Sequence, residues 1–132
     1  MPAALAKIVD ATVTAYPRYA RGNPTMLVHA CTAPNAVLRT LPLLPRELWR
    51  TSLAAAWSAS AAVVSAYAPP APAADPAADL DVTGDPSQVI EAALRHGGEH
   101  VIKFTDTALS VHTRTSNPTA LSAALSAVQL DA

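Results

Sequence analysis

The chain has 132 residues, of which 51% are hydrophobic and 14% are charged, and its net charge is −1. This length suits one domain with ample material for an apolar core. No run of Lys or Arg occurs, so neither a nucleic-acid partner nor a polybasic membrane site is expected, because a basic patch supplies most of the nonspecific affinity for nucleic acid.

The single cysteine, Cys31, excludes an intrachain disulfide and fits a reducing, cytoplasmic setting. No apolar signal core follows a basic start at the N-terminus. Residues 51–74 carry no charge, but they are rich in Ala and Ser and end in a proline cluster. This composition favours a buried helix over a membrane span.

The first elements are predicted from helical spacing and from proline. Residues 3–16 place their apolar side chains on one helical stripe, and Pro17 is expected to end or kink that helix. The Asn-Pro pair at 23–24 starts the next helix, since Asn is a good N-cap and Pro suits the first helical position. Ala-Pro-Asn at 33–35 is expected to break it, leaving a second short helix over 35–41.

The longest helix is predicted to open at residues 44–47 and to run to about Ala68. Its later turns carry almost no polar bulk, so we expect it to be buried on most sides. Residues 69–84 form a Pro/Ala-rich linker. The apolar stripe of the helix consists of Trp49, Leu53, Trp57, Ser60, Val64 and Tyr67.

Three further helices are predicted in the C-terminal part. Asp-Pro at 85–86 starts one, and Gly97-Gly98 ends it. A second covers about 99–113, and Asn-Pro at 117–118 starts the last, with a stripe of Leu121, Leu125 and Val128. No period-two strand pattern occurs. The predicted class is therefore all-α: an irregular bundle of about five to seven helices in a single domain over 1–132.

Two polar side chains stand out in the helix that starts near residue 99. His100 and Lys103 lie within about 60° of each other around the helix axis. If both turn inward, Lys103 must be paired, neutral or modified, because a buried unpaired ammonium is costly; a carbamylated lysine is an anionic donor that binds metal. Alternatively, Glu99 and Lys103 form an ordinary i, i+4 surface pair, and His100 is a first-turn surface residue.

His29 is the only polar side chain between Met26 and Cys31, so it is expected to face inward, either as a hydrogen-bonded core residue or as a ligand. Cys31 has no spacing that supports a Cys-His nucleophile. His96 is interpreted as a residue of a helix C-terminal turn, and His112 as peripheral.

Three segments, taken in order, resemble the questin oxidase-like family. They are residues 22–32 (GNPTMLVHACT), residues 38–67, and residues 96–103 (HGGEHVIK). The first and last are similar to the His-x-x-Thr and His-x-x-Lys segments of that family. The resemblance implies an all-helical oxidoreductase that oxidises and cleaves aromatic polyketides such as anthraquinones with oxygen.

The resemblance also implies cofactors and ligands. Some family members are NADPH-linked, and others use a non-haem iron held by histidines and a modified lysine. Carried onto this chain, the metal ligands would be His29, His100 and Lys103. Iron with open positions could activate dioxygen beside an aromatic substrate.

Only the C-terminal part of the family is resembled. We therefore expect a fragment or one part of a split enzyme, completed by an N-terminal segment, a second chain or self-association. The alternative is a non-catalytic helical remnant or protein-interaction module, which predicts an exposed apolar patch where a partner docks.

Overall fold

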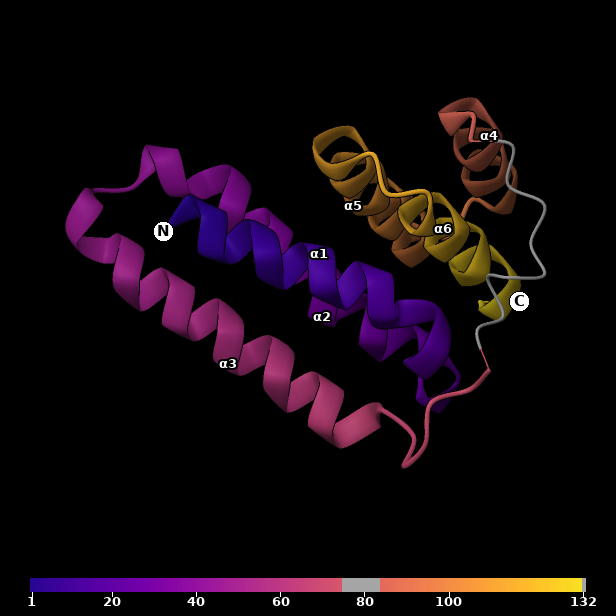
Figure 1. Ribbon diagram of the computed structural model, residues 1–132, viewed down its shortest axis with the longest axis horizontal. Coiled ribbons are helices and arrows are strands. Elements are labelled where there is room, and N and C mark those ends of the chain that lie inside the picture. The colour runs from indigo at the N-terminus through magenta and orange to yellow at the C-terminus, as the bar shows by residue number, and fades with distance from the viewer. Residues whose placement is uncertain (75–83, 132) are drawn as a thin grey trace.

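The computed structural model describes residues 1–74 and 84–131, and this part of the chain consists of helices and the turns between them (Figure 1). Short 3-10 turns, η1 (Ala20–Gly22), η2 (Leu41–Leu43) and η3 (Arg46–Leu48), separate the first three α-helices. The predicted all-α class is confirmed. Its six described α-helices are α1 (Pro2–Tyr19), α2 (Pro24–Thr40), α3 (Trp49–Tyr67), α4 (Pro86–His96), α5 (Glu99–Thr115) and α6 (Thr119–Leu130).

The helices α1 to α3 form one half of the fold, and α4 to α6 gather on the other side of α1 and α2 (Figure 1). The main core lies between the two halves. Phe104 of α5 is fully buried there, and its ring centroid lies 4.3 Å from that of Tyr16 in α1. A smaller core formed by Leu5, Leu41 and Ala56 joins the start of α1 to α3.

Side-chain caps start the helices where the sequence predicts them. At each of three starts, a side-chain oxygen accepts a backbone N–H of the first turn at 2.9 or 3.0 Å. These caps satisfy N–H groups that have no partner inside the helix. Gly97 ends α4 with a φ of +75°, a conformation that costs glycine little. Asn23 and Asp85 are the N-cap residues of α2 and α4, and Asn117 precedes Pro118, the N-cap position of α6.

The predicted break at residues 33–35 is wrong, because α2 runs through Pro34 to Thr40. Proline has no N–H, so the carbonyl of Ala30, one turn earlier, loses its helical donor. The buried Ser60 hydroxyl of α3 donates to this carbonyl at 3.0 Å. The continuity of α2 thus depends on a side chain of the next helix.

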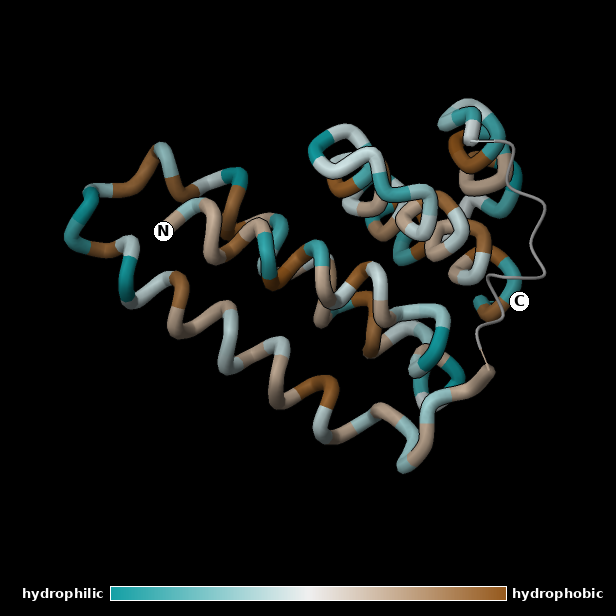
Figure 2. The backbone as a smooth tube through the Cα atoms, in the orientation of Figure 1, coloured by the Kyte–Doolittle hydropathy of each residue, from teal (hydrophilic) through white to brown (hydrophobic). Residues whose placement is uncertain are grey.

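The prediction that α3 is buried on most sides is also wrong. Only Ala56 and Ser60 are buried in it, and Trp57 is 60% exposed. Figure 2 shows that α3 is mostly pale or brown after its first turn, with little of the hydrophilic colour. α2 covers one face of α3, and no described element covers the face that carries Trp57.

Two smaller expectations differ from the structure. α1 continues through the buried Pro17 to Tyr19, because a proline in the last turn removes few helical bonds. The buried face of α6 is mainly alanine, and Leu125 and Val128 are only partly buried. Small side chains let α6 lie close to α1, α4 and α5.

The end of α3 is held against the junction of α1 and α2. A Cβ on Gly22 would lie 2.0 Å from the carbonyl oxygen of Tyr67, so only glycine permits this approach. Beyond α3, the Ala73 N–H donates to the Arg18 carbonyl at 2.9 Å. Residues 69–74 contain no helix, as the predicted 69–84 linker requires, and residues 75–83 of that linker lie outside the described residues.

Among the described helices, none has the length and apolarity that crossing a bilayer requires. This holds for α3, most of which lies in the uncharged stretch 51–74 considered above as a membrane span.

The bond between Ser60 and Ala30 predicts a specific energetic coupling. Ser60→Ala should lower the free energy of unfolding by about 1–3 kcal/mol, because it leaves the Ala30 carbonyl without a donor. In a Pro34→Ala background, the new backbone N–H at position 34 can donate to the Ala30 carbonyl. Ser60→Ala should therefore lower the free energy of unfolding by about 1 kcal/mol less in that background. Urea denaturation of the four proteins measures the cycle.

The matched control is Ser58→Ala, at an exposed position of the same helix. It should leave the unfolding midpoint nearly unchanged. Equal costs of Ser60→Ala in both backgrounds would show that the hydroxyl does not replace the missing helical bond.

Candidate functional site

His29 lies in the second turn of α2 and is partly buried. Its Nδ1 is 2.9 Å from the carbonyl oxygen of Thr25. A carbonyl only accepts hydrogen bonds, so this contact places a proton on Nδ1 and, in the neutral ring, leaves Nε2 with a free lone pair. The His29 side chain is therefore oriented from its own helix, and its second nitrogen is available to another group.

The structure brings His29 and His100 together. The two ring centroids are 5.1 Å apart, with 58° between the ring planes, although 71 positions separate the residues in the chain. His100 occupies the second position of α5, whose start follows the Gly97 turn. The turn between α4 and α5 thus places the first turn of α5 next to the first two turns of α2. The His100 imidazole therefore lies beside that of His29.

Lys103 does not turn inward with His100. Its Nζ lies 2.5 Å from Oε1 of Glu99, and the two side chains are 51% and 72% exposed. The Lys103 ammonium lowers the pKa of the Glu99 carboxyl, with smaller contributions from His100 and His29. Of the two interpretations that the sequence left open, the structure shows the i, i+4 surface pair for Lys103.

The residues present supply an incomplete donor set for the iron that the resemblance implies. His29 and His100 offer two imidazoles, and Lys103 is engaged with Glu99. Within the described part of the chain, no three His, Cys, Asp or Glu side chains gather closely enough to hold a metal ion. The hollow beside His100 is too narrow for a water molecule, so an aromatic ring has no place there.

His96 and His112 have structural positions. Nδ1 of His96 accepts the Gly98 N–H at 3.1 Å, and its Nε2 lies 2.8 Å from the Asp131 carbonyl oxygen, so the ring ties the α4–α5 turn to the end of α6. Nδ1 of His112 lies 3.3 Å from the Asn117 carbonyl oxygen. These contacts agree with the interpretation of both residues as turn or peripheral residues.

A groove runs between α1 and α3, at a place that the sequence did not predict. Three adjoining hollows of about 460, 440 and 280 Å³ follow it along the two helices. α2 forms the floor of the third hollow, through Leu27, Ala30 and Cys31. The signal in the sequence was the apolar stripe of α3, which we interpreted as a buried face.

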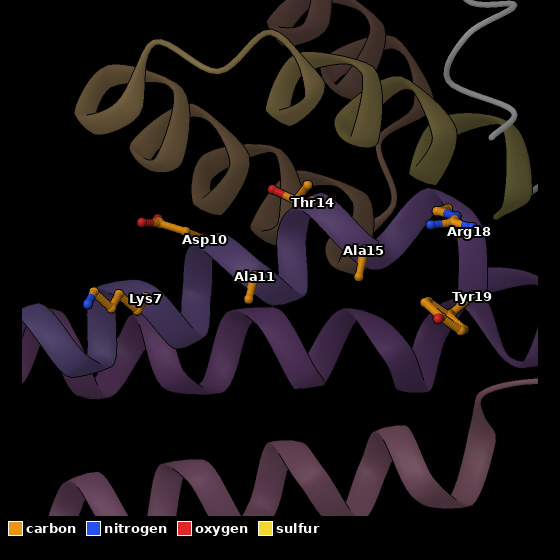
Figure 3. Close-up of a pocket in the computed structure, with 7 residues that line it drawn as sticks. All are labelled: Lys7, Asp10, Ala11, Thr14, Ala15, Arg18 and Tyr19. Atoms are coloured by element: carbon orange, nitrogen blue, oxygen red, sulfur yellow. The ribbon is translucent and has the colours of Figure 1, made fainter. Parts of the chain in front are cut away.

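Three alanines, Ala4, Ala11 and Ala15, form part of the α1 wall of the groove. Figure 3 shows the neighbouring surface of α1, where Ala11 and Ala15 lie on the side toward α2 and α3, while Asp10 and Thr14 lie on the side toward α5. Asp10 forms an ion pair with Arg114 of α5. This carboxylate is therefore drawn away from the groove and does not line it.

Cys31 should be unreactive in the native protein. Its side chain is 1% exposed, and burial raises the pKa of its thiol to about 12, whereas an unfolded cysteine titrates near 8.5. Because only the thiolate is nucleophilic, an aromatic disulfide reagent should modify one thiol per chain in guanidinium and almost none in buffer at pH 8. Raising the pH to 9 should speed the modification of Cys31 only in the denatured protein. If Cys31 of the native protein reacted at a rate comparable to that of the denatured protein, the floor of the groove would have to open.

Comparisons with models of protein families, with curated proteins and with solved structures found no match to this chain. The questin oxidase-like resemblance accordingly stays a prediction from its three short segments.

Proposed function

We propose that this chain is a helical protein-interaction module whose α1–α3 groove receives an apolar helix of another protein. The observation that carries the proposal is the exposure of Trp57, 60% open at the middle of an apolar groove. Burying a large apolar side chain contributes about 1.5–3 kcal/mol, which folding of this chain leaves unused at Trp57. Contiguous apolar surface of this kind marks interaction sites on folded domains.

The arrangement of the helices supports a helical partner. α1 and α3 run in the same direction on either side of α2 (Figure 1). A helix lying in the groove would face α2 and complete a four-helix bundle, in which each helix packs against two neighbours. This is the helix-in-groove mode of recognition, in which the apolar face of an amphipathic helix supplies the contacts.

The walls of the groove have the spacing that such packing requires. Among the residues that line the groove, one stripe on α3 and one on α1 recur at alternating intervals of four and three, as in knobs-into-holes packing; Leu53, Ser58, Ser60 and Ser65 of α3 and Lys7, Thr12, Tyr16 and Tyr19 of α1 line the groove beside these stripes. The many alanines of the two stripes allow an incoming helix axis to approach to about 8–10 Å. The residues of the stripes are Arg50, Ala54, Trp57, Ala61 and Val64 on α3, and Ala4, Ile8, Ala11 and Ala15 on α1.

Trp57 fluorescence tests the proposal. A Trp-free helical peptide with a Leu/Ala face and neutral polar flanks should shift the emission of the protein to the blue as it covers Trp57. The shift should be absent in Trp57→Phe. Ala61→Gln should weaken binding at least about tenfold, because it inserts a polar side chain into tightly packed apolar surface and costs more than about 1.4 kcal/mol.

Ala62→Gln is the matched control, since Ala62 is exposed on the same helix and does not line the groove. It should bind the peptide as the parent protein does. No emission shift with any helical peptide would exclude the module. If the parent protein self-associates in sedimentation experiments and Ala61→Gln abolishes this self-association, the occupant of the groove is a second copy of this chain.

A second candidate function is favoured by one observation, the 5.1 Å contact of His29 with His100. We propose that this pair belongs to the oxidoreductase site predicted by resemblance, with Lys103 as a third ligand when it is carbamylated. The free Nε2 of His29 supports metal binding. A partner that completes the donor set and supplies a substrate cavity would be needed for oxidation of an aromatic polyketide.

Calorimetric titration with Co²⁺ or Fe²⁺ under anaerobic conditions tests this candidate. His29→Ala and His100→Ala should each lower the affinity at least about tenfold, since changes to outer-shell partners alone already cost that much. Lys103→Ala should lower it only when bicarbonate is present. His112→Ala is the control, and equal affinity in all variants would remove the pair from consideration as a metal site.

A further inference from the structure

The charges of this chain are divided unequally between its two parts. Residues 1–74 contain six Lys or Arg and two Asp or Glu, which gives a net charge of +4. Residues 75–132 contain three Lys or Arg and eight Asp or Glu, which gives a net charge of −5. Together these give the net charge of −1. The part of the chain that forms the groove is therefore cationic, although the chain as a whole is nearly neutral.

Two of the six cations of this part, Lys7 and Arg50, line the groove. Lys7 of α1 and Arg50 of α3 both line its first hollow, one on each wall. Lys7 also lines the second hollow, and Arg18 borders the outer face of α1 farther along (Figure 3). The Lys7 and Arg50 side chains are exposed, so each can reach toward a helix lying between the walls.

The two carboxylates of residues 1–74 leave these cations uncompensated. Asp10 is bound to Arg114 of α5, and Glu47 lies in η3, outside the lining of the groove. Within residues 1–74 and 84–131, the ion pairs that form do not include Lys7, Arg18 or Arg50. Among the described residues that line the groove, the charged ones are therefore the two cations Lys7 and Arg50, which border an apolar floor.

We infer that the helix received by the α1–α3 groove is acidic on both flanks of its apolar face; this inference rests on the proposed function. Glu or Asp at the positions that border the apolar stripe would lie opposite Lys7 on one side and Arg50 on the other, as the e and g positions of helical bundles do. Such pairs choose and orient the partner more than they strengthen the complex. A basic flank would be repelled at both walls.

A set of three peptides separates this inference from the proposed function. All share one Leu/Ala face over about twenty residues, which span about 30 Å as a helix, and their flanking positions are Gln, Glu or Lys. The Glu peptide should bind about three- to tenfold more tightly than the Gln peptide, from two exposed ion pairs, and the Lys peptide more weakly than both. The preference should nearly vanish in about 1 M salt, where the screening length is about 3 Å.

Charge-reversing variants locate the effect. Lys7→Glu and Arg50→Glu should each reduce the preference for the Glu peptide, and together they should reverse it. Arg95→Glu, on α4, changes the net charge by the same amount as either single variant and should leave the preference unchanged. Equal binding of all three peptides would overturn the inference and leave the groove as a helix site, whereas binding of none would remove the proposed function itself.

Discussion

The hydrogen bond from Ser60 to the Ala30 carbonyl joins α3 to α2 at the point where Pro34 interrupts the helical bonding of α2. Pro34 removes the helical donor to that carbonyl, and an unsatisfied buried carbonyl costs about 1–3 kcal/mol. The position of α3, which presents Ser60 to this carbonyl, therefore stabilises α2 as one continuous helix. A side chain of one helix thus compensates for a proline in the helix before it.

Two other contacts keep α3 in the same place along its length. The small core of Leu5, Leu41 and Ala56 holds its first half, and the close approach of Gly22 to the Tyr67 carbonyl holds its end. Ser60 lies between these two contacts. Together the three contacts fix one face of α3 on the rest of the fold, and the opposite face of α3, which carries Trp57, stays uncovered by the described residues. The groove between α1 and α3 is thereby preorganised, so a partner helix need not order it on binding.

The candidate sites differ in how far the sequence could predict them. The chemistry of His29 was evident from its place in an apolar segment, and the start of α5 was evident from the Gly97-Gly98 turn. Their meeting was predicted only through a family resemblance, because no local pattern states how α2 and α5 pack. The helical wheel permitted an inward position for Lys103. Glu99, one turn earlier, instead binds Lys103 at the surface, where the ammonium keeps its hydration and avoids the cost of burying a charge.

By itself, the sequence determined the helical class, the starts at Asn23, Asp85 and Asn117 and the turn at Gly97, because caps, glycines and helical periodicity act over a few residues. Tertiary structure decided whether a proline breaks a helix and which apolar stripe is buried. Pro34 is tolerated because Ser60 arrives from another helix, and α3 stays exposed because the described part of the chain provides no element to cover it. Both outcomes depend on partners distant in sequence, which local patterns do not encode.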